Sequence, residues 1–170
     1  MRVKPRQTVP RVELPLVGGG SIVLGAPRPE KMTLVVFYRG LHCRRCNPYL
    51  NKVQALLPEF EKIGVHVVAA SADSHECARQ SADAWGIDKL DIAYDLPIET
   101  ARQYGLFITR GVREDEPELC IEPATFFIAP DGTLIACVIN SLTRLRPAPE
   151  DVLETAAHML ETGGDPKGEA

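Results

Sequence analysis

Two cysteines separated by two residues, Cys43 and Cys46, are the residues of this sequence best suited to chemistry. In a reducing compartment a close C-x-x-C pair is more typical of redox or metal chemistry than of a structural disulfide. Their spacing lets the two sulfurs meet over one helical turn, so that one can attack a substrate and the other can resolve the mixed disulfide. We therefore predict that Cys43 and Cys46 form a reversible, redox-active disulfide.

The residues around the pair favour the thiolate, which is the reactive form of cysteine. The pair lies where an apolar run gives way to a helical pattern, and the N–H groups at a helix N-terminus stabilise an anion. Arg44 and Arg45 add two permanent cations, which should lower the pKa of at least one thiol. His42 and Arg39 are further candidates for tuning the thiolate, although Arg39 could equally pair with a surface acid. Of the two sulfurs, the one that precedes the helix should be the more exposed.

Three other interpretations of the pair compete with redox chemistry. A structural zinc site needs four ligands and usually repeats the C-x-x-C pair, which occurs once here. The other candidate ligands lack a supporting spacing: His42, His66, His75 and Cys77. Two buried, inert thiols are opposed by the two arginines between them. A fold that has kept its shape and lost its chemistry would serve as a binding domain. We expect no metal and no cofactor.

The segments around the pair predict an α/β sandwich with a mixed sheet. Residues 33–38 form a continuous β-branched and aromatic run, which indicates a strand buried on both faces. Apolar residues then recur at helical spacing over 46–60, with Pro58 expected to break that helix, and 65–70 reads as the next parallel strand. Two later apolar runs flank Pro-Asp-Gly and predict a C-terminal antiparallel hairpin, which a final helix follows.

Length and composition fit one domain of a soluble globular protein. The chain has 170 residues, 45% of them hydrophobic and 25% charged, with a formal net charge of -4. That charge opposes a role in nucleic-acid binding, and no apolar run reaches the ~20 residues of a membrane helix. The start lacks a secretory signal, so a cytoplasmic location is expected. We divide the chain into an N-terminal arm (1–20), one domain (21–161) and a disordered tail (162–170).

Several segments together resemble the peroxiredoxin-like redoxins of the alkyl hydroperoxide reductase/thiol-specific antioxidant family. They are VVFYRGLHC (35–43), LPEF (57–60), ASAD (70–73), EPATFFI (122–128) and PDG (130–132). The resemblance covers about residues 10–160 and implies a thioredoxin-like three-layer sandwich with an antioxidant function. It also implies that the partners are protein or small-molecule disulfides or hydroperoxides, with a thiol electron donor such as a thioredoxin or glutathione system.

Two chemistries diverge within this superfamily. Peroxiredoxins carry P-x-x-x-T-x-x-C, in which the last cysteine attacks peroxide, and the match puts Cys46 there. Arg39 and Cys43 then replace the Pro and the Thr of that motif, and Pro123 stands where the activating Arg is found. Thioredoxins instead carry W-C-x-x-C and a cis-proline that faces the sulfurs. The cysteine pair and Pro123 fit that pattern, with His42 in place of the Trp.

Because the peroxide-contacting Thr and Arg are replaced, we favour a thiol–disulfide oxidoreductase in which Cys43 attacks and Cys46 resolves. The alternative is a thiol-dependent peroxidase with Cys46 as the peroxidatic cysteine and Cys43 as the resolving one. A third possibility is a non-catalytic or zinc-holding binding domain. Cys120, which lies near Pro123 in the sequence, is a candidate for an additional resolving cysteine.

Overall fold

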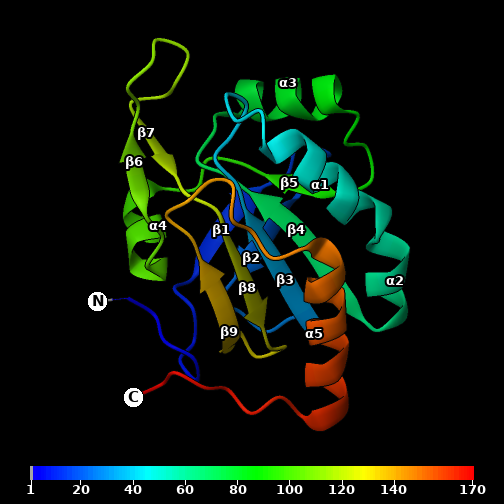
Figure 1. Ribbon diagram of the computed structural model, residues 1–170. Coiled ribbons are helices and arrows are strands. Elements are labelled where there is room, and N and C mark those ends of the chain that lie inside the picture. Colours follow the sequence, from blue (N-terminus) through cyan, green and yellow to red (C-terminus); the bar gives the residue numbers. More distant parts are fainter. Residues whose placement is uncertain (1) are drawn as a thin grey trace.

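A five-stranded mixed sheet forms the centre of the protein in a computed structural model that describes residues 2–170 (Figure 1). The strand order is β5-β4-β3-β8-β9. The bounds are β3 Met32–Phe37, β4 Val65–Ala70, β5 Asp91–Ala93, β8 Ala124–Ile128 and β9 Leu134–Ile139. The β3, β4 and β5 strands are parallel, whereas β8 runs antiparallel to both β3 and β9. The predicted mixed sheet with a C-terminal antiparallel hairpin is therefore confirmed.

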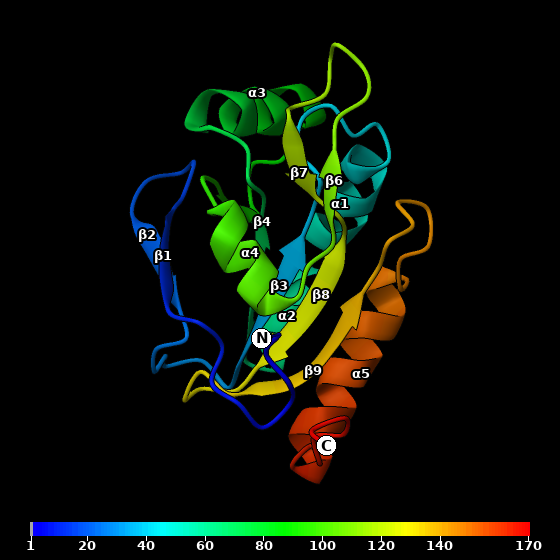
Figure 2. The same ribbon diagram turned by 90° about the vertical axis from the view of Figure 1, so that its left-hand side faces the viewer.

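Helices cover both faces of the sheet, which gives the three layers predicted from the resemblance (Figure 2). The helices are α1 Cys46–Ala55, α2 Leu57–Lys62, α3 His75–Trp85, α4 Ile98–Tyr104 and α5 Pro149–Thr162. Side chains of α1, α2, α3 and α5 pack into one hydrophobic core, and α4 packs into the other. All six residues of β3 are buried because the strand lies between the two cores. None of the helices within residues 2–170 is long and apolar enough to cross a membrane.

The predicted helix over 46–60 is divided at Leu56 into α1 and α2. Pro58 lies in the first turn of α2, where its missing N–H group breaks no helical hydrogen bond. The predicted break is therefore confirmed, and because of it α1 ends at Ala55. Cys46, the first residue of α1, lies at the N-terminal end of this helix.

Two small antiparallel pairs of strands differ from the prediction. Residues 12–15 of the predicted arm form β1 (Val12–Pro15), which pairs with β2 (Ser21–Leu24). Val9 and Leu14 are buried, because this hairpin covers the α4 side of the sheet, so 1–20 is only in part an arm. Residue 1 lies outside the described residues. Residues 110–118 form the tip of a second pair, β6 (Ile108–Arg110) and β7 (Leu119–Ile121). Beyond α5, Asp165 pairs with Arg6 at 2.6 Å.

Candidate active site

The turn between β3 and α1 places both cysteines. Gly40 adopts φ 118°, and a Cβ atom there would overlap the carboxylate of Asp73, so the position requires glycine. The Leu41 N–H group donates to Asp73 Oδ2 at 2.8 Å. The Cys43 N–H group donates to the Gly40 carbonyl at 3.0 Å, and the Cys46 N–H group to the Cys43 carbonyl at 2.9 Å. These bonds hold the two cysteines in consecutive tight turns at the end of β3.

Asp73 makes the stability of this turn depend on pH. Burial raises the pKa of Asp73 from 3.8 to about 6, against the opposing effect of the Leu41 N–H group. A carboxyl group with a raised pKa in the folded state stabilises the fold below its unfolded pKa, and this stabilisation is lost as pH rises through about 6.

We expect Asp73→Asn to keep the acceptor for the Leu41 N–H group and to remove the titration. Relative to the wild type, the variant should gain on the order of 1 kcal/mol between pH 4 and pH 8, a figure reduced for partial solvent exposure. Urea unfolding at both pH values measures the difference, and Asp88→Asn, at an exposed position, is the control. A difference between wild type and Asp73→Asn that does not change with pH would contradict this account.

Both cysteines are buried, with Cys43 3% and Cys46 0% exposed. Cys43 is the more exposed of the two, as expected, but the difference is small because both residues pack in the core on the α1 side of the sheet. Both cysteines are free thiols, and their side chains are joined by a hydrogen bond. The pair thus meets as its spacing predicts, in a position sheltered from solvent.

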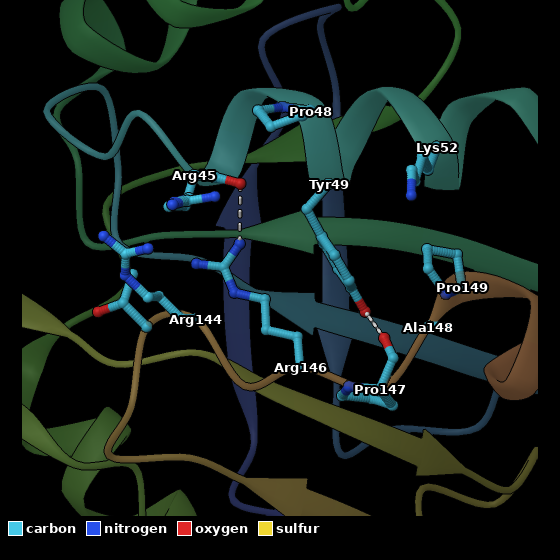
Figure 3. Close-up of a pocket in the computed structure, with 10 residues that line it drawn as sticks. Arg45, Pro48, Tyr49, Lys52, Arg144, Arg146, Pro147, Ala148 and Pro149 are labelled. Carbon is cyan, nitrogen blue, oxygen red and sulfur yellow. Dashed lines mark hydrogen bonds between the residues drawn. The ribbon is translucent and has the colours of Figure 1, made fainter.

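Arg146 supplies the cation of the site. Its Nη2 atom lies 3.2 Å from the sulfur of Cys46 and 3.7 Å from that of Cys43. Nη1 donates to the Arg45 carbonyl at 3.3 Å, and the guanidinium lies over the ring of Tyr49, 5.2 Å from its centroid (Figure 3). The Tyr49 hydroxyl donates to the Pro147 carbonyl at 3.0 Å, so α1 also anchors the connection between β9 and α5 that carries Arg146.

The pKa values of the two cysteines are shifted in opposite directions. A hydrogen bond from the Cys46 thiol lowers the pKa of Cys43 to about 6, and the charge of Arg146 contributes in the same direction. Burial raises the pKa of Cys46 well above its ordinary value, and the hydrogen bond to Cys43 and the charge of that thiolate add to the effect. At neutral pH the site therefore holds a thiolate at Cys43 and a thiol at Cys46.

Arg44 and Arg45 are the cations that we predicted to lower the pKa of a thiol. Both side chains are exposed, and within residues 2–170 neither guanidinium makes a hydrogen bond to a sulfur. Arg45 acts instead through its backbone carbonyl, which accepts from Arg146. The effect of Arg44 and Arg45 on the thiolate stays a prediction, whereas Arg146, which has no signal in its spacing, contacts the sulfurs from a distant connection.

Arg39 pairs with two acids, the buried Glu122 and Glu116 of the loop between β6 and β7, whose Oε1 atom lies 3.6 Å from Arg39 Nη2. Its Nε atom lies 3.1 Å from Glu122 Oε1, and its Nη2 atom donates to the Cys120 sulfur at 3.5 Å. Glu122 also accepts from the Thr109 hydroxyl at 2.7 Å and the Thr143 hydroxyl at 3.2 Å. Thr143 precedes Arg146 on the same connection, so this buried carboxylate joins the end of β3 to the segment that carries the cation.

Two further predicted positions, Pro123 and His42, have different outcomes. The peptide bond before Pro123 is trans, so the predicted cis-proline is wrong; Pro123 acts as a strand start whose carbonyl accepts from Asn140 N–H at 3.0 Å. It still lines a small cavity together with Arg146.

Burial lowers the pKa of the half-buried His42, with Arg39 acting in the same direction, so His42 is neutral at pH 7. Within residues 2–170 no group of three or more His, Cys, Asp or Glu side chains could hold a metal ion.

A thioredoxin-like fold that holds a thiolate and a thiol beside a half-buried guanidinium defines a thiol-dependent oxidoreductase. Residues 5–137 match the AhpC/TSA family, and the chain belongs to that family, as its sequence resemblance predicted. No curated protein matches the chain in sequence.

Solved structures of similar proteins show the same fold. Peroxidoxin BcpB from Mycobacterium tuberculosis is 19% identical with a TM-score of 0.72, covering 95% of this chain and 98% of its own. AhpC from Enterococcus faecalis is 24% identical with a TM-score of 0.74, covering 96% and 97%. A peroxiredoxin-like protein from Aquifex aeolicus is 15% identical with a TM-score of 0.76, covering 94% and 89%.

Proposed function

We propose that this chain reduces hydroperoxides and that the Cys43–Cys46 pair becomes an internal disulfide in each turnover. The observation that carries the proposal is the contact of Arg146 with both sulfurs, at 3.2 and 3.7 Å. A guanidinium beside a thiolate stabilises the nucleophile and offers N–H donors to the peroxide oxygens, where negative charge develops as the O–O bond breaks. Arg146 thereby supplies the cation that Pro123 cannot provide at the family's usual position.

The lowered pKa of Cys43 and the raised pKa of Cys46 set the order of the steps, because Cys43 is the thiolate and Cys46 carries a proton. The Cys43 thiolate attacks the terminal oxygen of the hydroperoxide, the O–O bond breaks, and the sulfur becomes a sulfenic acid. The departing alkoxide takes the proton of the Cys46 thiol and leaves as an alcohol. The Cys46 thiolate then attacks the Cys43 sulfur, an S–S bond forms, and hydroxide leaves and takes a proton from solvent as water. The pair loses two electrons, and the peroxide gains them.

Membership of the AhpC/TSA family favours hydroperoxide reduction over the disulfide exchange that we preferred from the sequence. The family motif also favours Cys46 as the first nucleophile, and Arg146 lies closer to its sulfur. We nevertheless assign the first attack to Cys43, because it precedes α1, its sulfur contacts Arg146 at 3.7 Å, and the charge of Arg146 is among the causes that lower its pKa. We further propose that a thiol donor, such as a thioredoxin or glutathione system, reduces the disulfide again.

The stoichiometry of oxidation tests the proposed function. Reduced protein with Cys77 and Cys137 changed to Ser should consume one equivalent of hydroperoxide and lose two thiols. Mass spectrometry should then find the link between Cys43 and Cys46. A model disulfide serves as the comparison substrate. Faster reaction with the disulfide than with peroxide, or peroxide consumption that leaves both thiols free, would contradict the proposal.

A further inference from the structure

A pocket of about 390 Å³ lies beside the cysteine pair, between α1 and the connection from β9 to α5 (Figure 3). Four cationic side chains line it: Arg45 and Lys52 from the α1 side, and Arg144 and Arg146 from the connection. None of the described residues that line the pocket is Asp or Glu. In a chain with a net charge of -4, such a local excess of positive charge is the opposite of the overall balance.

No carboxylate of the described chain pairs with the cations of this pocket, and only Arg146 has an anionic partner, the thiolate of the cysteine pair. Within residues 2–170, none of the four cationic side chains forms an ion pair with a carboxylate, whereas most arginines in other parts of the described chain do. Arg146 also leaves its buried Nε atom without a hydrogen-bond partner in the described structure. Unpaired cations around a concave site raise the local concentration of anions and accelerate their arrival.

The pocket and the thiols are connected by one residue. Arg146 lines the pocket and contacts both sulfurs, so an anion in the pocket lies beside the residue that contacts the pair. Lys52 and Arg144 stand on either side of Arg146, where each can attract a carboxylate (Figure 3). Guanidinium groups match the two oxygens of a carboxylate through parallel N–H donors. Pro48, Pro147 and Pro149 in the pocket wall limit the movement of its walls and add apolar surface for a short carbon chain.

We propose that this pocket binds the carboxylate of a small-molecule reactant of the cysteine pair, an inference that rests on the proposed function for its reactive group. The carboxylate can belong to either of two reactants: a hydroperoxide that bears a carboxylate or a thiol reductant that bears one. In the second case the thiolate of the reductant attacks one sulfur of the Cys43–Cys46 disulfide and displaces the other as a thiolate. A second molecule of the reductant then attacks the mixed disulfide, so that two thiols become one external disulfide and the pair regains two electrons.

Alkylation of the reduced pair tests the charge preference without any peroxidase activity. Iodoacetate carries a carboxylate and iodoacetamide does not, and both react with the same thiolate, so a change in thiol pKa cancels in the ratio of their rates. We expect Lys52→Glu and Arg144→Glu each to lower the iodoacetate-to-iodoacetamide ratio at Cys43 roughly tenfold. Lys31→Glu, which makes the same charge change at an exposed residue before the opposite end of β3, should leave the ratio unchanged.

A ratio unchanged in both Lys52→Glu and Arg144→Glu would overturn the inference, and so would an equal fall in Lys31→Glu. Steady-state kinetics then separates the two sources. In one experiment, a neutral hydroperoxide and a carboxylate-bearing hydroperoxide are each reduced in the presence of an excess of a neutral thiol. In the other, a neutral thiol and a carboxylate-bearing thiol each serve as the reductant for a neutral hydroperoxide. The half-reaction in which Lys52→Glu lowers the anionic-to-neutral ratio of kcat/KM identifies the ligand. Failure of the wild type to reduce a neutral hydroperoxide would contradict the proposed function and leave the alkylation result standing.

Discussion

Replacing Cys43 with Ser will abolish the reduction of hydroperoxides, whereas Cys46→Ser protein will complete the first oxidation and stop. In the first variant the thiolate is gone, and the remaining Cys46 is a buried thiol with a raised pKa. In the second variant Cys43 keeps Arg146 within 3.7 Å and forms a sulfenic acid that no neighbouring thiol can resolve. Trapping with a sulfenic-acid reagent, followed by mass spectrometry of the labelled peptide, should locate the oxidised sulfur at Cys43.

The single variants also decide between the two assignments of the nucleophile. Sulfenic acid that forms rapidly at Cys46 in the Cys43→Ser protein would assign the first attack to Cys46, as the family motif indicates. Cys137→Ser serves as the control, because this half-buried cysteine lies on β9 and should not affect the stoichiometry. Because both changes alter buried side chains, thermal unfolding should first show that each variant is folded.

Replacing Arg146 with Met should slow peroxide reduction by about 10²-fold or more, in line with the loss of one charge-stabilising donor at an active site. The guanidinium is the cation in contact with both sulfurs, and its charge is among the causes of the lowered pKa of Cys43. In the wild type, the rate of alkylation by iodoacetamide should rise with pH through about 6 and then level off. In Arg146→Met this rise should move to higher pH.

Arg146→Lys separates charge from geometry. An ammonium group keeps the positive charge, but it cannot contact two sulfurs and the Arg45 carbonyl with a planar fork. We expect the pKa of Cys43 in Arg146→Lys to lie between those of the wild type and Arg146→Met. The rate of peroxide reduction in Arg146→Lys should be nearly as low as in Arg146→Met. Arg79→Met, at an exposed position on α3, is the matched control. A pH profile that is the same in wild type and Arg146→Met would show that the Cys46 thiol alone sets the pKa of Cys43.

Much of the fold could be predicted because its central elements bury continuous apolar runs. The β3 and β4 strands, the break between α1 and α2, and the hairpin of β8 and β9 each follow from local sequence chemistry. The pairs β1–β2 and β6–β7 were missed because they consist of three- and four-residue strands stabilised by contacts with distant segments. A strand that short carries too little alternation to identify it.

The candidate site could be predicted only in so far as it is local. The pair, its turn and the start of α1 occupy consecutive residues, and their spacing was sufficient. The cation could not be found in this way, because Arg146 lies 100 residues beyond Cys46 and only the folded chain brings the two together. Glu122 was missed for the same reason, since its buried carboxylate gains its role from Arg39, Thr109 and Thr143, which lie on three other segments.

The location of Arg146 on a connection between two elements also affects how such a site can change during evolution. Insertions and deletions accumulate in connections because they leave the hydrogen bonds of the sheet intact. A cation carried there can be lost, gained or moved in a lineage while the cysteines at the end of β3 remain in place. In this chain the nucleophile and the cation beside it therefore lie on separate segments, so a change in the length of the β9–α5 connection would move the cation without moving the cysteines.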